Sequence, residues 1–139
     1  MATKMIFLNL PVDDLDRARG FYEALDWSVN PDFTDENAAC VVVDDNICLM
    51  LLAKDFYTTF AERPIADTLT YSSAAYALAL PSRDAVDDLT DAAVKAGGTE
   101  EVVKNDRRAQ EAEIGMYGRT FIDLDGHQWE PFHMPYPQA

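Results

Sequence analysis

Glu130 is the side chain whose type and position make it the strongest candidate for chemistry in this sequence. It alternates with Gln128 and Phe132 in an extended run, so these three side chains are expected on one side of a strand. A carboxylate at this place is a candidate general base, or an anchor for a cationic ligand. The alternative is an exposed or salt-bridged strand carboxylate with a structural role. Arg119 is a candidate partner for its charge.

The two histidines and two cysteines form no recognisable metal or nucleophile motif. Cys40 and Cys48 are eight positions apart. They favour buried apolar packing over a disulfide, because a reducing cytosol opposes the bridge. His127 follows a turn glycine, and His133 has the strand parity opposite to Glu130. Both histidines are therefore expected to be structural or at the surface.

The composition of the 139 residues favours one folded domain that binds neither nucleic acid nor membranes. Hydrophobic residues make up 48% of the chain, which is enough for a core. The 11 basic and 25 acidic residues give a net charge of −14, which repels phosphate backbones and anionic lipids. No apolar run approaches the roughly 20 residues of a membrane-spanning helix, and no secretory signal is recognisable. We expect a cytoplasmic protein.

Periodicity predicts the elements that must position these side chains. In the first half, the predicted ranges are a strand at 5–12, a helix from an acidic cap at 13–14 to about 26, a short strand within 27–33 interrupted at Asn30-Pro31-Asp32, and strands at 38–43 and 47–52 around a turn at 44–46. In the second half, they are a connection at 54–72 with a short helical turn, a strand at 75–80, a helix capped by Ser82 and ended by Gly97-Gly98, a strand-like run at 99–104, a charged loop at 105–114, and a hairpin at 121–134 that turns at Asp125-Gly126. The acidic side chains of the second helix are interpreted as a solvated face: Asp84, Asp87, Asp88 and Asp91.

The two halves repeat one order of elements, which indicates a duplicated βαβββ module. The prediction is an α+β fold in which modules 1–53 and 73–139, joined by the connection 54–72, form one domain over residues 1–139. Each helix covers one face of its sheet, so every second strand residue points to the opposite face. If the sheets curl toward each other, those residues line one ligand cavity: Phe7, Asn9, Cys48, Met50, Ala75, Gln128, Glu130 and Phe132. Six aromatic residues are compatible with a ligand box, although core or dimer packing is the commoner role of such residues: Phe7, Phe56, Tyr57, Phe60, Tyr117 and Trp129.

Two motifs resemble the vicinal oxygen chelate superfamily over nearly the whole chain. One lies in LPVDDLDRARGFYEAL, with the pattern D-L-x-x-x-x-x-F-Y, and the other is D-x-D-G-x-x-W-E in YGRTFIDLDGHQWEPF. The superfamily contains glyoxalases, extradiol dioxygenases, fosfomycin-resistance transferases and bleomycin-resistance binding proteins. The resemblance implies two βαβββ modules in a cupped mixed sheet, commonly a homodimer, and a divalent metal held by one residue from each of four strands.

The resemblance places four residues of this chain at the metal-ligand positions. They are Phe7, Met50, Glu130 and Ala75, with Tyr76 in place of Ala75 if the register shifts by one. Phenylalanine cannot bind a metal, and a methionine thioether suits copper(I) better than the ions used by glyoxalases and dioxygenases. Glu130 alone matches, whereas catalytic sites generally use about three protein ligands. We therefore expect no metal site and no cofactor.

The leading hypothesis is a protein that binds a small organic ligand in its cavity without a catalytic metal. Bleomycin-resistance proteins bind rather than catalyse, and a cationic ligand would suit the charge of −14. One alternative is an enzyme: a metal-dependent lyase, similar to lactoylglutathione lyase, or a dioxygenase with non-standard ligands, or a metal-free enzyme that uses Glu130. Another is a scaffold whose cavity is filled by its own side chains.

Overall fold

The computed structural model describes residues 4–102 and 107–135. Its contacts divide the chain into two compact units, Met1–Asp67 and Thr68–Ala139. The boundary falls within the predicted connection 54–72, and the single domain over 1–139 stays a prediction. No helix in the described part of the chain is long and apolar enough to cross a membrane.

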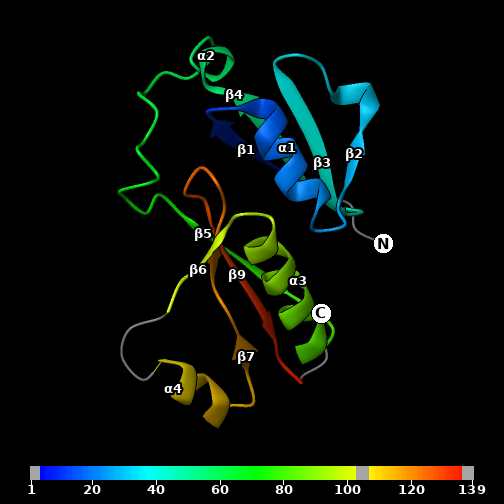
Figure 1. The fold of residues 1–139 in the computed structure, drawn as a ribbon, viewed down its shortest axis with the longest axis vertical. Helices are drawn as coiled ribbons and strands as arrows, with labels where there is room; N and C mark the ends of the chain where they lie inside the picture. The colour runs from blue at the N-terminus through cyan, green and yellow to red at the C-terminus, as the bar shows by residue number, and fades with distance from the viewer. Residues whose placement is uncertain (1–3, 103–106, 136–139) are drawn as a thin grey trace. The chain divides into compact units, whose positions relative to one another are not determined.

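The first unit is a four-stranded sheet with one helix on its face (Figure 1). Its elements are β1 (Ile6–Val12), α1 (Leu15–Glu23), β2 (Ser28–Asn30), the 3-10 turn Pro31–Phe33, β3 (Ala38–Asp44), β4 (Ile47–Ala53) and α2 (Lys54–Tyr57). The strand order is β1-β4-β3-β2, with β1 and β4 parallel and the other pairs antiparallel. The predicted order of strand, helix and three strands is confirmed, as is the helical turn after β4.

Local sequence explains how α1 is placed on this sheet. The side chain of Asp14 accepts a hydrogen bond from the backbone N–H of Arg17 at 3.1 Å and so caps the helix. Phe21 and Tyr22 then lie buried on the apolar face of the helix. The parity predicted for β1 is confirmed, since Val12 is fully buried and Phe7, on the other face, is 50% exposed.

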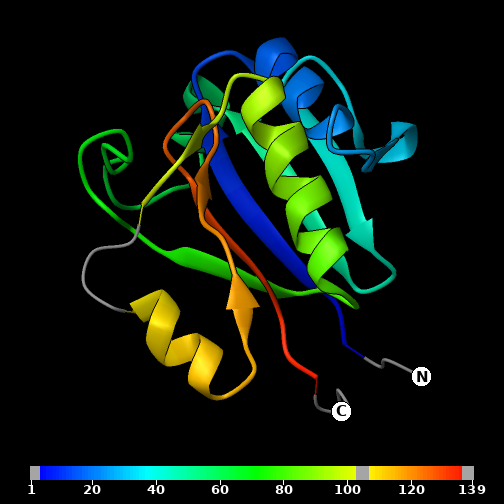
Figure 2. The same cartoon turned by 60° about the horizontal axis from the view of Figure 1, so that its bottom comes forward.

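The second unit repeats strand, helix and strands, with one additional helix (Figure 2). Its elements are β5 (Ala75–Ala79), α3 (Arg83–Lys95), β6 (Thr99–Glu100), α4 (Arg107–Glu113), β7 (Tyr117–Gly118), β8 (Phe121–Ile122) and β9 (Gln128–His133). The strand order is β5-β9-β8-β6, and β7 also pairs with β9. The parallel pair β5 and β9 corresponds to β1 and β4 of the first unit.

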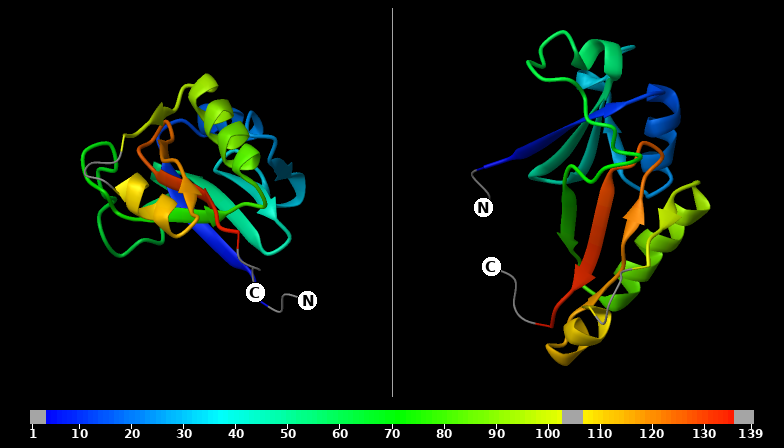
Figure 3. Two further views of the ribbon diagram at one scale, coloured as in Figure 1. Left: turned by 90° about the horizontal axis from the view of Figure 1, so that it is seen from below. Right: turned by 90° about the vertical axis from the view of Figure 1, so that its left-hand side faces the viewer.

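The helix α3 covers one face of this sheet and runs beside β9 and β7 (Figure 3, right). Ser82 caps it by accepting from the backbone N–H of Ala85 at 3.0 Å, as its sequence predicts. Val86 of α3 is fully buried, and Trp129 of β9 is 2% exposed, with its ring centroid 6.3 Å from that of Phe121. The α3 side of β9 is therefore the core side, and Glu130 points to the other face.

Two predictions for the segment after α3 are wrong. The strand expected over 99–104 is only Thr99–Glu100 among the described residues, and 103–104 lie outside them. The loop expected over 105–114 contains the helix α4, while 105–106 lie outside the described residues. Arg107 and Arg108 each form an ion pair with Glu111 one turn later, and such pairs favour a helix that has no apolar stripe.

The turn before β9 explains the second sequence motif. The side chain of Asp123 accepts hydrogen bonds from the backbone N–H groups of Asp125 and His127, at 2.9 and 2.8 Å. Gly126 has a φ of 93°, a conformation that favours glycine. This motif therefore builds the turn that leads into β9 and fixes the start of the strand carrying Glu130.

Candidate functional site

A cavity of about 270 Å³ lies beside Glu130 in the second unit. Glu130 and Phe132 of β9 line it from the face opposite to α3, together with Ala77, the register neighbour of Glu130 on β5. Met116 and Met134 add apolar surface. Two of the predicted cavity residues, Glu130 and Phe132, thus line a cavity that the structure describes.

The partner of Glu130 is Arg107 of α4, whereas the candidate Arg119 lines the same cavity but pairs with other carboxylates. Arg107 donates from Nη2 to Glu130 Oε2 at 3.2 Å, and the side chain of Glu130 is 24% exposed. The Glu130 charge, followed by their hydrogen bond, raises the pKa of the Arg107 guanidinium above its ordinary value. Glu130, the candidate general base or ligand anchor, is therefore paired with the permanent positive charge of Arg107.

Glu111 is a buried carboxylate at the same cavity that the sequence analysis missed. Its residue is 8% exposed, and it accepts from Arg107 Nε at 3.2 Å and from Arg108 Nη1 at 2.7 Å. Arg108 also donates from Nη2 to the Thr120 hydroxyl at 2.8 Å. The two guanidinium groups compensate for the burial of the Glu111 charge. The spacing of Arg107, Arg108 and Glu111 was the signal that could have identified this cluster.

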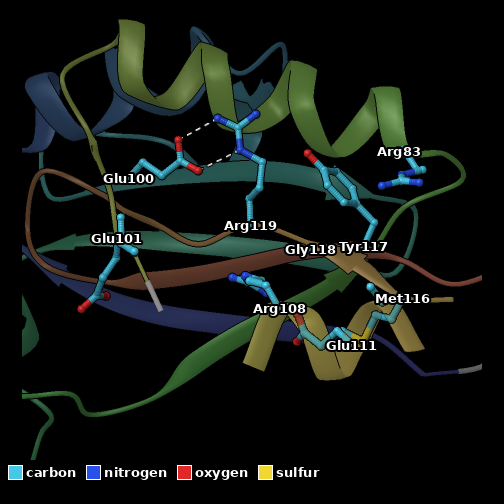
Figure 4. A pocket seen from close by; sticks show the side chains of 11 residues that line it. Arg83, Glu100, Glu101, Arg108, Glu111, Met116, Tyr117, Gly118 and Arg119 are labelled. Carbon is cyan, nitrogen blue, oxygen red and sulfur yellow. Dashed lines mark hydrogen bonds and ion pairs between the residues drawn. The ribbon is translucent and has the colours of Figure 1, made fainter. Parts of the chain in front are cut away.

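A second cavity of about 280 Å³ lies beside α4 and β7 (Figure 4). Figure 4 shows Arg119 in its centre, with Glu100 on one side and Tyr117 on the other. Arg108 and Glu111 border both cavities, as do Met116 and Arg119. The helix α4 is therefore a common wall of two hollows in this unit.

Arg119 holds the acidic residues on this side of the unit. Its Nε and Nη2 donate to the two oxygens of Glu100 at 2.8 and 2.7 Å, and Nη1 and Nη2 donate to Asp87 and Asp91 at 2.9 Å. The hydrogen bond to Glu100 is the main cause that raises the pKa of Arg119 above its ordinary range, and the same bond lowers the pKa of Glu100. The expected solvated face of α3 is confirmed for Asp84, Asp88 and Asp91, which are exposed, although Asp91 also binds Arg119. Asp87 is the exception, since it is half-buried and accepts from both Arg119 and Tyr117.

Tyr117 adds a hydroxyl and an aromatic face to the second cavity. Its hydroxyl donates to Asp87 Oδ1 at 2.5 Å, and the Arg83 guanidinium lies 4.5 Å from its ring centroid. The hydrogen bond between Tyr117 and Asp87 raises the pKa of the tyrosine and, with the bond from Arg119, lowers the pKa of the aspartate. Tyr117 is thus anchored on α3 through its hydroxyl while it lines the second cavity.

The other predicted cavity residues lie on the expected face within their own unit. In the first unit, strand register pairs Phe7 with Cys48 and Asn9 with Met50, so these side chains share one face. In the second unit, the register pairs are Ala75 with Gln128, Ala77 with Glu130 and Ala79 with Phe132. That the two sets line one cavity stays a prediction.

The histidines, cysteines and remaining aromatic residues occupy structural positions. His133 Nδ1 lies 2.9 Å from the carbonyl oxygen of Leu80, and His127 is 4% exposed within the turn before β9. Cys40 and Cys48 are buried, and burial raises the pKa of the Cys40 thiol. Trp129 belongs to the core of the second unit, whereas three aromatic rings pack together around α2 of the first unit: Phe56, Tyr57 and Phe60.

The residues at the implied metal positions do not fit a divalent ion. Phe7 and Ala75 carry no side-chain donor atom, Met50 carries a soft thioether, and Glu130 Oε2 already accepts from the Arg107 guanidinium. Within residues 4–102 and 107–135, no three histidine, cysteine, aspartate or glutamate side chains gather as a metal site.

Comparisons with known proteins identify the fold. A family model described as "Bleomycin resistance protein-like N-terminal" matches residues 4–44, and no curated protein matches the chain. A glyoxalase-related enzyme from Fulvimarina pelagi is 18% identical with a TM-score of 0.73, covering 99% of this chain and 94% of that one. A hypothetical protein from S. aureus is 23% identical with a TM-score of 0.72, covering 96% of this chain and 94% of that one. A glyoxalase/bleomycin resistance protein/dioxygenase family enzyme from Burkholderia phytofirmans is 14% identical with a TM-score of 0.72, covering 95% of this chain and 99% of that one.

The chain has the glyoxalase/bleomycin-resistance-like fold, and the predicted α+β class is confirmed. The N-terminal family match and this fold together support the vicinal oxygen chelate superfamily, which is the resemblance that the two sequence motifs indicated.

Proposed function

We propose that this protein binds a small organic molecule in the cavity beside Glu130 and uses no catalytic metal there. The observation that supports this most directly is the cavity itself, where apolar walls from Phe132, Met116 and Met134 meet charged groups from Glu130 and Arg107. Small-molecule sites typically combine a mostly apolar lining with a few polar groups that orient the ligand. The poor fit of the metal positions supports the metal-free part of the proposal.

An enzyme is the second candidate, because two solved structures of the same fold are named as enzymes. In a metal-free enzyme Glu130 would be the base. A base must reach the proton of its substrate, and one oxygen of Glu130 is engaged by Arg107. This contact favours binding over catalysis as the role of the site.

Elemental analysis and native mass spectrometry of protein purified without chelators test the proposal. We expect less than a tenth of an equivalent of nickel, zinc, manganese or iron, and a mass that includes a small organic adduct or accepts one from a fragment library. Near-stoichiometric metal that is lost in Glu130→Gln would overturn the metal-free proposal. Turnover of a substrate by the wild type, abolished in Glu130→Gln while binding persists, would favour the enzyme.

A homodimer and a cytoplasmic location belong to the same proposal. The dimer comes from the resemblance to the superfamily, and the location comes from the sequence. Light scattering tests the dimer, since a monomer would give a mass near 15.5 kDa.

A further inference from the structure

The Arg107 guanidinium has hydrogen-bond donors left over at the cavity. A guanidinium offers five N–H donors. Nε donates to Glu111, and one hydrogen of Nη2 donates to Glu130. These two bonds occupy the edge of the guanidinium formed by Nε and Nη2. The remaining donors, on Nη1 and Nη2, have no acceptor among residues 4–102 and 107–135 and form its terminal edge. Such an edge matches the two oxygens of a carboxylate.

Most carboxylate oxygens of the cavity, by contrast, already accept from cations. Both oxygens of Glu111 accept from arginines, and Oε2 of Glu130 accepts from Arg107. A cationic ligand at the remaining oxygen of Glu130 would lie beside the Arg107 guanidinium, which repels it. An anionic ligand displaces nothing and adds hydrogen bonds to donors that lack them.

The local charge also differs from that of the whole chain. The lining of this cavity includes three arginines and two glutamates, whose formal charges sum to +1, whereas the chain carries −14. Arg107 forms an ion pair with Glu130, the residue that the resemblance places at a metal-ligand position. The site therefore has a resident cation that belongs to the protein.

We propose that Arg107 is the binding cation of this site and that the cavity takes a small organic monoanion. Its carboxylate or other oxyanion would lie on the terminal edge of Arg107, and its apolar body against Phe132, Met116 and Met134. This inference rests on the proposed function and replaces the cationic ligand expected from net charge. A cavity of about 270 Å³ is at the lower end of ligand pockets, which suits an acid with one or two rings.

Matched probes of one shape and three charges test the inference. Benzoate, benzamide and benzylamine are titrated into the ¹⁵N-labelled full chain, and the shifts of its backbone amide signals are followed by NMR. Two further series carry the same three head groups on a phenylmethyl and on a 2-naphthyl body. We expect the carboxylates to bind roughly tenfold to a hundredfold more tightly than their amides, as a charge-assisted hydrogen-bond pair implies. The amines should bind most weakly.

Two substitutions of Arg107 separate its charge from its shape. Arg107→Met removes the cation and leaves Glu130 facing the cavity, so the order of the probes should reverse, with amines above amides and carboxylates last. Arg107→Lys keeps the charge without the planar edge and should retain a reduced preference for carboxylates. Arg19→Gln is the matched control, because it removes an exposed arginine that is paired with Glu23 on α1 of the first unit. It should leave the order unchanged.

The outcomes distinguish this inference from the function on which it rests. If no probe of any charge shifts cavity amides, the proposed binding function fails. If amides bind as well as carboxylates, or the wild type prefers amines, the cavity binds ligands but Arg107 does not select anions. A carboxylate preference that survives Arg107→Met in a folded protein would also overturn the inference.

Discussion

Arg107 and Glu130 are 23 positions apart in the chain, and their guanidinium nitrogen Nη2 and carboxylate oxygen Oε2 lie 3.2 Å apart. This contact links α4 to β9, and the bond from Arg108 to Thr120 links α4 to the segment after β7. Glu111 is the buried residue of α4, whose other residues are partly or fully exposed. The helix is therefore held to its unit by ion pairs more than by apolar burial.

Glu111→Gln is expected to weaken the attachment of α4. The change leaves two arginines without their shared carboxylate, and breaking a mostly buried ion pair costs about 2–4 kcal/mol. Hydrogen exchange should show faster exchange of the α4 amides, while the amides of α3 change little. Glu113→Gln is the control, because Glu113 is an exposed carboxylate of the same helix. Equal protection of α4 in both variants would contradict the role given to Glu111.

The contrast between β1 and α4 explains which parts of the site the sequence could predict. Leu10 and Val12 are buried and Phe7 is half-exposed, as the alternation predicts. Successive side chains of a strand point to opposite faces, so the sequence of β1 alone indicates which residues share a face. Glu130 was placed on the cavity face by the same argument. The helix α4 has a pattern of charges and no apolar stripe, so apolar periodicity does not predict it.

The pairing of charges was beyond sequence reasoning for a different reason. Arg119 is a candidate partner of Glu130 from the sequence and lines the same cavity, but it binds Glu100, Asp87 and Asp91. Exposed acidic residues on a helix usually face solvent, and only the fold brings the end of β7 beneath α3. The ion-pair partner of a long side chain depends on which residues the tertiary structure brings near it, and local sequence periodicity does not indicate this.

Arg119→Met is expected to destabilise the second unit at neutral pH. The Arg119 side chain is 20% exposed, and its three partners are between 39% and 69% exposed. We therefore expect the free energy of unfolding to fall by about 1–2 kcal/mol, a value between those of fully exposed and fully buried ion pairs. The pKa of Asp87 and of Glu100 is lowered from 3.8 and 4.5 in the folded protein. Their stabilisation is therefore present above those values and is lost as pH falls through the folded pKa values.

Urea unfolding of the wild type and Arg119→Met from pH 7 to pH 3 measures this difference. The two curves should converge toward acid pH. A constant difference across the range would mean that Arg119 acts through the packing of its stem and not through its charge. Arg63→Met is the control, since Arg63 is an exposed arginine in the segment after α2.

Tyr117→Phe is expected to raise the pKa of Asp87 toward its ordinary value. The hydrogen bond from Tyr117 is the largest cause of the lowered pKa, and Arg119 is the second. The aspartate should keep part of its shift, because the Arg119 bond remains. Carboxyl ¹³C chemical shifts followed against pH give the value directly, and Tyr71→Phe, which changes an exposed tyrosine, is the control. An unchanged Asp87 titration would show that the hydroxyl does not hold the carboxylate.

Gly126→Ala is expected to destabilise the turn that sets the start of β9. The φ of Gly126 is 93°, and an added Cβ would lie 2.1 Å from the carbonyl oxygen of Thr68, so backbone must move. We expect a loss of about 2–4 kcal/mol in the free energy of unfolding. Gly20→Ala is the matched control: a Cβ at this helical glycine meets no described atom within 4 Å. It should stabilise α1 by about 0.5–1 kcal/mol. Thermal unfolding followed by circular dichroism compares the two variants, and equal melting temperatures would contradict the close approach of Thr68 to this turn.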